Sequence, residues 1–375
     1  MSSLGQDRFT GSIHRRNWFG FDWPLLIIVL LLCALGAVNL YSACVGDQPS
    51  LFTNQLIYMG IGLAALFAAF IVPYRRFEAA SYFIYAASIV LLIAVLVFGK
   101  VSHGAQRWLA IGPFSFQPSE LTKITMTLAL ARYFSTTRNY KGYSLKELVI
   151  PIILAVVPVG LIALQDLGTA MIHIFIFVSV LLFVRIKLRY LILTVLAGVV
   201  SIPLGWFYAL KDYQKGRVLT LLDPSRDPLG AGYHIRQSII AVGSGEIFGK
   251  GYLHGTQTKL QFLPEHHTDF IFSVFTEEWG FVGSMVLVGL FFLMIFMGLS
   301  ISNRSTERYG NVLAFGLTSI LFWHVGINML MVMGLAPVVG VTLPFMSYGG
   351  TSLIVMMVVA GLLLNVSARR YMFQS

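Results

Sequence analysis

The chain has 375 residues, of which 57% are hydrophobic and only 11% are charged, and its mean hydropathy is +0.78. This composition excludes a soluble globular domain of ordinary make-up and is typical of a protein embedded in a lipid bilayer. The formal net charge of +10 would suit a nucleic-acid partner. The basic residues, however, gather in short connections on one side of the predicted spans, which is a signal of membrane topology and argues against nucleic-acid binding.

Apolar stretches long enough to cross a bilayer, which takes about 20 residues in a helix, recur along the whole sequence. They are continuously apolar rather than alternating, and this favours membrane helices. We therefore predict an all-α, polytopic membrane protein that forms a single domain over residues 1–375. The ten predicted spans cover 22–42, 52–72, 79–98, 117–134, 147–164, 168–185, 189–210, 269–299, 310–335 and 343–366.

Lysine and arginine set the orientation of these spans, because short cytoplasmic loops carry an excess of both. With the N-terminus in the cytoplasm, most basic residues fall in cytoplasmic segments, among them Arg75, Arg304 and Arg308. The short loops on the other side are nearly free of them. An even number of spans returns the chain to the same side, so we expect a multi-pass protein of the cytoplasmic (inner) membrane with cytoplasmic tails at 1–21 and 367–375.

Two connections on the extracytoplasmic side are long enough to be functional. The first, 99–116, leads directly into the span that opens QPSELTKITM. The second, 211–268, is the longest polar stretch and joins the seventh and eighth predicted spans. Prolines and many glycines divide it into turns, and its aromatic and apolar residues are unlike the composition of disordered segments. We predict a large ordered extracytoplasmic loop that contains a short surface helix near 233–242.

Asp269 stands where this polar loop turns into the eighth span, in the sequence LPEHHTDFIFSVF. A carboxylate beside a membrane span is costly to desolvate and usually marks a functional path. As an N-cap or first-turn acid, helped by Thr268, it would be held in its ionised form by the helix dipole. Facing a cavity, the same carboxylate could act as a general base or as a ligand of a divalent cation. The two interpretations are compatible.

Three residues around the start of the fourth span form a second group of charges. Glu120 and Lys123 lie three residues apart, so they share a helix face and can pair. They are either a structural ion pair turned to the bundle interior or a polar wall of a substrate pocket. Arg107, in the preceding loop, either lies at the membrane interface or binds a phosphate or pyrophosphate through the N–H groups of its planar guanidinium.

The remaining acids near the spans have simpler interpretations. Asp166, in the very short turn QDLGTA between the fifth and sixth spans, is expected to cap the helix that follows. Glu277 and Glu278 lie about 12 Å further along the eighth span than Asp269 and are expected to hold helices together. The sequence contains no nucleotide-binding loop or nucleophile elbow, so we expect no nucleotide cofactor.

These residues belong to longer motifs that together cover essentially the whole chain. The sequence resembles the shape, elongation, division and sporulation family of integral membrane proteins, and YHIRQS and GKGYLHGTQ are more similar to its elongation members than to its division members. One departure is Glu246, which stands where the family usually has a second glycine after GSG. The motifs that carry the resemblance are GAQRWLAIGPFSFQPSELTK (104–123), QDLGTA (165–170), DPLGAGYHIRQSIIAVGSG (227–245), GKGYLHGTQTKLQFLPEHHTDFIF (249–272), EEWGFVG (277–283) and PVVGVTLPFMSYGGTS (337–352).

The resemblance implies ten transmembrane helices and peptidoglycan glycosyltransferase activity in cell elongation and rod-shape maintenance. The implied substrate is lipid II, a disaccharide-pentapeptide on undecaprenyl pyrophosphate. The implied partner is a class B penicillin-binding protein, the transpeptidase of the elongation complex. By the same resemblance, Asp269 matches the essential aspartate of the family and is the expected catalytic residue. The expected substrate-binding residues are Arg107, Glu120, Lys123, Asp166, Glu265 and Thr268.

The expected mechanism follows from the way lipid II presents its sugars at the outer face of the membrane. Asp269 would act as general base on the acceptor hydroxyl, which attacks the donor's anomeric carbon with inversion, so that undecaprenyl pyrophosphate leaves. Arg107 and Lys123 would offset the pyrophosphate charge, Glu120 would fix Lys123, and Asp269 would hold in part any divalent cation, Mg²⁺ or Mn²⁺. Two other functions stay open: a lipid II flippase or transporter, and a non-catalytic scaffold for the transpeptidase.

Overall fold

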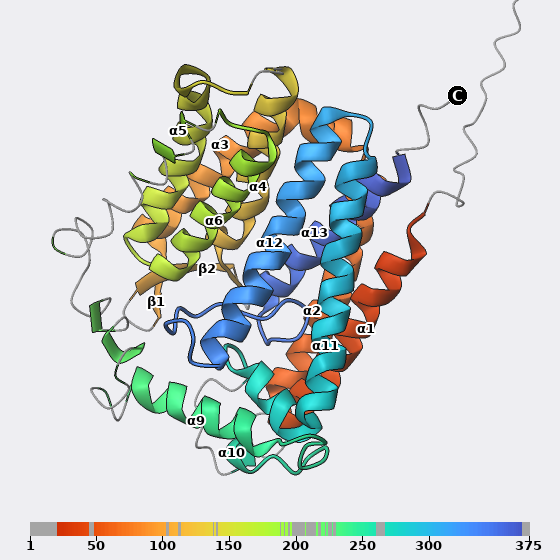
Figure 1. Ribbon diagram of the computed structural model, residues 1–375, viewed down its shortest axis with the longest axis vertical. Coiled ribbons are helices and arrows are strands. Elements are labelled where there is room, and N and C mark those ends of the chain that lie inside the picture. Colours follow the sequence, from red (N-terminus) through yellow and green to blue (C-terminus); the bar gives the residue numbers. More distant parts are fainter. Residues whose placement is uncertain are drawn as a thin grey trace, which may run out of the picture.

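The computed structural model describes residues 21–44, 49–102, 105–111, 114–137, 142–187, 230–259 and 267–369, together with a few separate positions between 139 and 227. Seven of the described helices are long and apolar enough to cross a membrane. The helices of the bundle are α1 (Trp23–Cys44), α2 (Pro49–Ile71), α3 (Tyr74–Phe98), α4 (Pro118–Thr136), α5 (Leu145–Ala163), α6 (Leu167–Phe183), α11 (Ile271–Arg304), α12 (Arg308–Val332) and α13 (Gly350–Arg369) (Figure 1).

Two further helices, α9 (Ala231–Ser244) and α10 (Thr256–Lys259), lie across one end of the bundle, which we call the α9 end (Figure 1). The short helix predicted near 233–242 is therefore confirmed as α9, which is longer than predicted. Nine of the ten predicted spans coincide with bundle helices. The remaining predicted span, 189–210, lies mostly outside the described residues, as do parts of the predicted loop that follows it, among them 260–266.

The last predicted span begins in the wrong place. The apolar run from 343 predicts a helix there, yet α13 begins only at Gly350. The segment before it is irregular and is fixed by other parts of the chain, because Gln55 on α2 donates its amide hydrogen to the Ser347 carbonyl oxygen at 3.1 Å. Pro344 and the paired glycines 349–350 are the local reason, since proline lacks the backbone donor and glycine favours turns.

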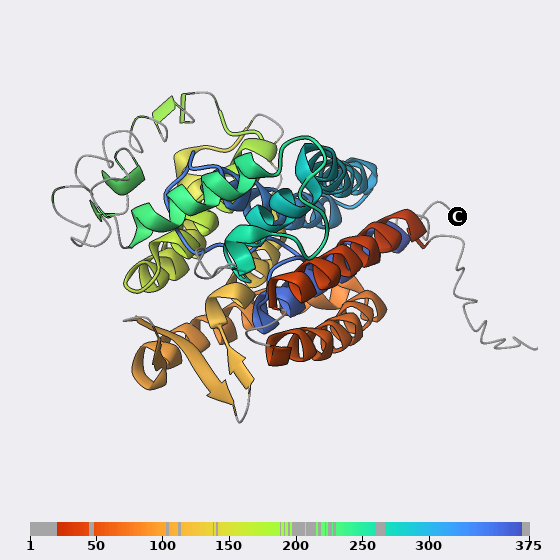
Figure 2. The ribbon, with the colours of Figure 1, turned by 90° about the horizontal axis from the view of Figure 1, so that it is seen from below.

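The all-α prediction also needs a correction in the connection 99–116. This segment forms a small antiparallel sheet in the order β1 (Lys100–Ser102), β2 (Ala105–Ile111) and β3 (Phe114–Phe116). Pairing of β2 with β3 places Leu109 opposite Phe116. The sheet projects beside the end of α3 (Figure 2). Because β3 leads directly into α4, it fixes where α4 enters the bundle.

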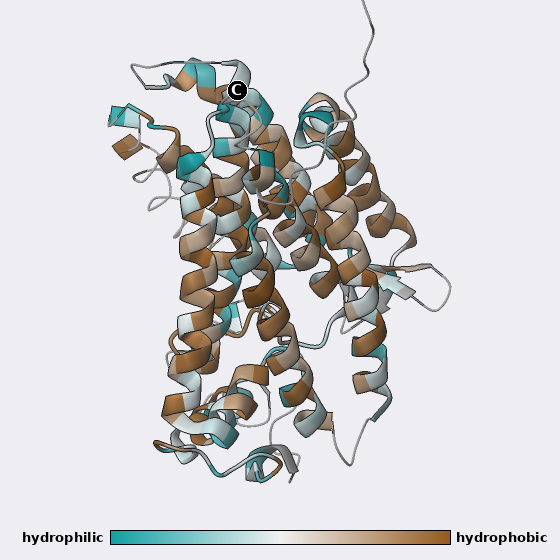
Figure 3. Ribbon diagram, turned by 90° about the vertical axis from the view of Figure 1, so that its right-hand side faces the viewer, coloured by the Kyte–Doolittle hydropathy of each residue, from teal (hydrophilic) through white to brown (hydrophobic). Residues whose placement is uncertain are grey.

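The centre of the bundle consists of α4, α12 and α13, whose residues are mostly buried. The helices α2, α3 and α5 lie at the periphery and leave most of their residues at least partly exposed. Many of these exposed side chains are large and apolar, such as Phe83 and Phe98, and hydrophobic residues dominate the long helices on the side shown in Figure 3. A surface of this kind is stable in lipid and would aggregate in water.

The end of the bundle opposite α9 carries ion pairs between helices. Arg75 pairs with Glu307, which also accepts a hydrogen bond from the Tyr74 hydroxyl at 2.5 Å. Burial raises the pKa of Glu307, but the hydrogen bonds from Arg75 and Tyr74 outweigh it and hold that pKa below its usual value. Arg132 Nη1 lies 3.0 Å from Glu78 Oε1. These contacts tie α3 to α4 and to the connection between α11 and α12.

The helix α11 is broken at Gly280, whose φ of +65° lies in the left-handed region. A Cβ at this position would lie 2.2 Å from the backbone nitrogen of Gly249, so only glycine fits. After the break, the backbone N–H groups of Phe281 and Val282 donate to the carbonyl oxygens of residues 246 and 247 at 2.9 and 3.0 Å. The loop after α9 thus caps the membrane part of α11.

Glu246, at the position where the family usually has glycine, adopts a φ of +48°. A left-handed conformation costs a residue with a Cβ about 1–2 kcal/mol, and glycine would relieve this cost. Glycine also adds chain entropy to the unfolded state, which offsets about half of the relief. We therefore expect Glu246→Gly to raise the free energy of unfolding by about 1 kcal/mol, measured as a higher midpoint of thermal unfolding in detergent. Glu246→Ala keeps the Cβ, so an equal rise in that variant would contradict the backbone explanation.

Candidate active site

A cavity of about 880 Å³ lies at the α9 end of the bundle, a volume typical of pockets that bind small molecules. Its walls come from α2, α4, α6, α9 and α12, from the sheet, and from the segments that precede α11 and α13. Glu265, the remaining expected neighbour of Asp269, lies outside the described residues. The expected site residues that line the cavity are Arg107, Glu120, Asp166, Thr268 and Asp269.

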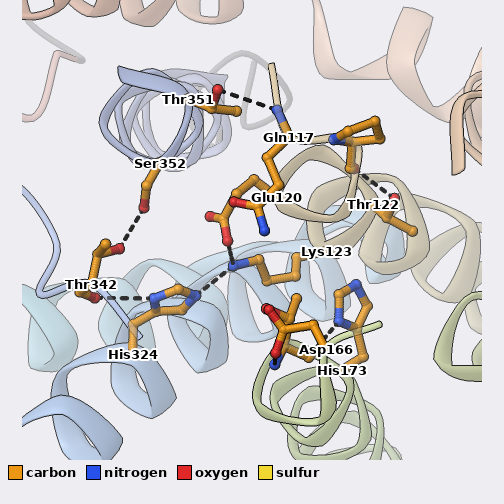
Figure 4. Close-up of polar contacts among 12 residues, drawn as sticks. Gln117, Glu120, Thr122, Lys123, Asp166, His173, His324, Thr342, Thr351 and Ser352 are labelled. Atoms are coloured by element: carbon orange, nitrogen blue, oxygen red, sulfur yellow. Dashed lines mark hydrogen bonds and ion pairs between the residues drawn. The ribbon is translucent and has the colours of Figure 1, made fainter. Parts of the chain in front are cut away.

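The predicted pairing of Glu120 with Lys123 on α4 is confirmed, because Lys123 Nζ lies 2.7 Å from Glu120 Oε1. Lys123 Nζ also lies 2.7 Å from Nε2 of His324, on α12. An ammonium group can only donate, so His324 Nε2 accepts and its Nδ1 carries the hydrogen. Nδ1 then donates to the carbonyl oxygen of Thr342 at 3.3 Å. A neutral imidazole thus joins α4 to the segment before α13 (Figure 4).

Lys123 lies behind the cavity wall. Its side chain is 0% exposed, whereas Glu120 and His324 both reach the lining of the cavity. A buried ammonium is tolerated only with a partner that offsets its desolvation, and Glu120 supplies one. Lys123 itself is not among the residues that line the cavity, so its positive charge acts on the cavity through Glu120 and His324. A direct contact of Lys123 with substrate stays a prediction.

Arg107 and Asp166 form the other ion pair of the site. Arg107, on β2, places Nη1 3.1 Å from Asp166 Oδ2 and donates from Nε and Nη2 to the Gln165 carbonyl oxygen at 3.1 and 2.7 Å. Asp166 also caps α6, since its Oδ1 accepts the backbone N–H of Thr169 at 3.2 Å. The predicted cap is confirmed. The pair fastens the sheet to the turn between α5 and α6 at the cavity wall.

The two roles of Asp166 can be separated by substitution. Asparagine is as good an N-cap as aspartate but lacks the charge, whereas alanine loses the cap as well. We expect Asp166→Ala to lower the free energy of unfolding by about 1 kcal/mol more than Asp166→Asn, which is the usual contribution of a cap. Thermal unfolding of the two variants in detergent measures the difference. Equal losses would mean that only the charge of Asp166 contributes.

Asp269 lies in the turn at residues 267–270 that precedes α11. The prediction that it is the N-cap or first-turn residue of this helix is wrong by one position, because the N-cap is Phe270. Asp269 lines the cavity together with Thr268. Gly340, in the segment before α13, faces its carboxylate, since a Cβ on Gly340 would lie 3.5 Å from Asp269 Oδ2. The carboxylate is thus placed at the start of a helix and at a cavity wall.

The other two acids of α11 have the structural role that we predicted. Glu277 Oε1, which is buried, accepts hydrogen bonds from Lys250 Nζ at 2.7 Å and from the backbone N–H of Thr256 at 2.8 Å. Glu278 accepts a hydrogen bond from Ser42 on α1. Neither acid is among the residues that line the cavity. They hold the loop between α9 and α10, and the helix α1, against the first part of α11.

Sequence reasoning missed several polar residues of the site. His324 contacts Lys123, and His234 on α9 and Lys100 on β1 also line the cavity. A histidine within an apolar span is rare enough to have signalled His324, because ionisable groups in spans usually face the bundle interior. Nothing in the local pattern distinguishes Lys100 from an ordinary residue at the end of a span.

Within the described ranges, no three histidine, cysteine, aspartate or glutamate residues come together as a metal centre. In the described turn at 267–270, Asp269 is the one carboxylate, and it is the ligand that we predict for Mg²⁺ or Mn²⁺. Single carboxylates do bind Mg²⁺ where substrate phosphates supply the other ligands. The divalent cation stays a prediction, and the chemistry below does not depend on it.

The fold and the cavity define a polytopic α-helical membrane protein with paired charges around a cavity at one end of its bundle. The chain belongs to the FtsW/RodA/SpoVE family, whose model, described as a cell cycle protein, matches residues 23–372.

Relatives cover nearly the whole chain. The Escherichia coli K12 protein named peptidoglycan glycosyltransferase MrdB is 43% identical over 352 residues, which are 94% of this chain and 94% of that protein. A chain of a peptidoglycan synthase complex matches with a TM-score of 0.82 and 35% identity, over 96% of this chain and 100% of that chain. The rod shape determining protein RodA of Thermus thermophilus matches with a TM-score of 0.71 and 32% identity, over 95% and 99%. The resemblance to elongation members is confirmed.

Proposed function

We propose that this protein is a peptidoglycan glycosyltransferase that polymerises lipid II into glycan strands during cell elongation and maintains rod shape. The observation that carries the proposal is the position of Asp269, a carboxylate at the wall of an 880 Å³ cavity that paired charges surround. The relatives named above support the activity, because the similarity extends over the whole cavity and not over a single motif. A shared fold alone does not establish an activity, so the proposal rests on the residues of the cavity as well.

The cavity is proposed to face the outside of the cytoplasmic membrane, with both chain termini in the cytoplasm. Arg75, Arg132 and Arg308 lie at the end opposite α9, and basic residues favour the cytoplasmic side. The predicted span 189–210 would be the seventh of ten and would carry the chain to the loop that contains α9. In this orientation the lipid tail of lipid II stays in the bilayer while its sugars reach Asp269.

In the proposed reaction, the Asp269 carboxylate accepts the proton of the acceptor sugar's hydroxyl group. The hydroxyl oxygen attacks the donor's anomeric carbon from the face opposite the leaving group, so a glycosidic C–O bond forms with inversion. The bond from that carbon to the pyrophosphate oxygen breaks, and undecaprenyl pyrophosphate leaves with the electron pair. A sugar hydroxyl group is a weak nucleophile while it keeps its proton, so a base that accepts this proton speeds the attack. General base catalysis typically raises the rate by about 10²- to 10⁴-fold.

The leaving pyrophosphate needs positive charge nearby. Arg107 lines the cavity, and each of its three guanidinium nitrogens contacts Asp166 or Gln165, which orients the group. Lys123 adds a second positive charge behind the wall, where Glu120 holds it. We propose that these residues stabilise the pyrophosphate as it departs. The proposed partner is a class B penicillin-binding protein that cross-links the strands, in keeping with the peptidoglycan synthase complex among the structural relatives.

The decisive experiment uses the purified protein in vesicles that contain lipid II with a fluorescent label. A glycosyltransferase produces strands that separate by length on a gel. A flippase produces no strands but makes labelled lipid II accessible to a reagent that cannot cross the membrane. A scaffold does neither alone. Strands from the wild-type protein would support the proposal, whereas transbilayer movement without strands would replace it by the flippase alternative.

A further inference from the structure

The turn that carries Asp269 is held by a buried asparagine of α12. The side chain of Asn328 is 0% exposed and donates one amide hydrogen to the Asp269 carbonyl oxygen at 2.8 Å and the other to the Val341 carbonyl oxygen at 2.7 Å. Val341 adjoins Gly340, the residue that faces the Asp269 carboxylate. One amide group therefore fixes both the backbone of the aspartate and the segment that faces its side chain.

A second buried asparagine holds the same turn from the other side. Asn39, on α1, is 0% exposed and donates to the Ile271 carbonyl oxygen at 3.0 Å. The backbone N–H of Tyr348 completes the arrangement by donating to the His267 carbonyl oxygen at 2.8 Å. The turn 267–270 and the first residue of α11 are thus attached to α1, to α12 and to the segment before α13, which are three elements far apart in the sequence.

The cost of these asparagines suggests that they serve more than packing. A polar amide inside a span is expensive to desolvate unless all its groups are bonded. Among the described residues, the Oδ1 atoms of Asn39 and Asn328 have no hydrogen-bond partner, although both atoms are buried. An apolar side chain would avoid this cost but would leave the carbonyl groups of the turn unattached. The two amides are retained where the backbone beside Asp269 must be held.

We propose that Asn328 and Asn39, which we call the asparagine clamp, are positioning residues that set the place of the Asp269 carboxylate in the cavity. The proposal rests on the proposed function of Asp269 as general base. A base must lie within hydrogen-bond reach of the proton that it takes, and a displacement of about 1 Å can cost about 10²-fold in rate. The clamp acts on the backbone and does not touch substrate, so its loss changes the rate constant of the chemical step more than it changes substrate binding.

The test compares Asn328→Ala with a matched control, Asn365→Ala. Asn365, on α13, is also 0% exposed, donates to the carbonyl oxygens of Ala69 and Phe70 at 2.6 and 3.1 Å and to that of Val72, and has an unbonded buried Oδ1. It lies at the end of the bundle opposite the cavity. Both variants remove a buried amide that donates to backbone carbonyl oxygens, so Asn365→Ala is expected to lose at least as much thermal stability as Asn328→Ala. Asn39→Ala is the second variant and removes the other half of the clamp without touching α12.

With purified protein and labelled lipid II, we expect Asn328→Ala to lower kcat at least about tenfold and Asn39→Ala at least about threefold. KM should stay within about twofold in both, and Asn365→Ala should keep kcat within about twofold of the wild type. The proposal is overturned if Asn328→Ala and Asn365→Ala lose kcat equally, or if Asn328→Ala raises only KM. If Asn328→Ala does not fold, an unchanged kcat in Asn39→Ala overturns it equally.

Failure of the clamp and failure of the proposed function give different results. If the wild-type protein makes strands, and Asp269→Ala does not, the general base stands and the asparagine variants decide the clamp. If Asp269→Ala makes strands as fast as the wild type, the role of Asp269 falls and the clamp falls with it, whatever Asn328→Ala does. A wild-type protein that makes no strands overturns both.

Discussion

Replacing Asp269 by asparagine is expected to lower the rate of lipid II polymerisation by about 10²- to 10⁴-fold, the range in which a general base contributes to catalysis. Asparagine has the same shape but accepts no proton. The reason lies in the placement of the carboxylate, which lines the cavity at the start of α11. Asp269→Glu keeps the charge but moves it outward by about one bond, so we expect an intermediate loss of about 10²-fold. Strand formation by purified protein, followed over time on a gel, measures each rate.

The matched control is Glu246→Gln, which removes an exposed carboxylate at the same end of the bundle, outside the residues that line the cavity. This variant should polymerise lipid II within about twofold of the wild-type rate, because net charge alone changes encounter only modestly at physiological salt. A loss in Glu246→Gln as large as that in Asp269→Asn would point to a general electrostatic effect and against a base at Asp269.

The largest change in stability is expected from breaking the pair between Glu120 and Lys123. Removing one partner of a buried ion pair typically costs about 3–5 kcal/mol, because the other charge is left in an apolar interior. Lys123→Met leaves Glu120 without its ammonium partner, and Glu120→Gln leaves an ammonium that is 0% exposed facing a neutral amide. We expect both variants to show a strongly lowered midpoint of thermal unfolding in detergent.

The double variant separates charge pairing from packing. When both charges are removed, no uncompensated charge remains, so Glu120→Gln combined with Lys123→Met should recover more than half of the stability lost in either single variant. Arg132→Gln serves as the control, since its pair with Glu78 is partly exposed and should contribute no more than about 1 kcal/mol. Additive losses in the double variant would show that the two side chains contribute separately by packing.

The sequence predicts most of the helices because their apolar runs are long and continuous, and it predicts contacts between residues that lie close in the chain. The pairing of Glu120 with Lys123 and the cap made by Asp166 both follow from a spacing of three residues. The contact of Lys123 with His324 depends on how α4 packs against α12, and no local pattern carries that information. The same holds for Asn328 and Asp269, which meet through packing.

Errors in the predicted boundaries have a different cause. The stretch before α13 is as apolar as a span, so hydropathy continues through residues where Pro344 and the bonds from other helices prevent a helix. In the connection 99–116 the strands are only three to seven residues long, too short for alternation to be recognised. Both segments lie beside the cavity, where contacts between distant parts of the chain decide the backbone more than local preference does.

The break in α11 at Gly280 has a consequence for how the protein tolerates membranes of different thickness. A long helix in a bilayer adjusts to a thicker or thinner hydrocarbon layer by changing its tilt. If the 34 residues of α11 formed one straight helix, such a change in tilt would displace its first turn and the Asp269 carboxylate beside it. With the break, residues 271–279 are bonded to α1 and to the loop after α9, and the same loop also holds the first residues after Gly280. We therefore expect the position of Asp269 to depend on this loop more than on the tilt of the membrane part of α11.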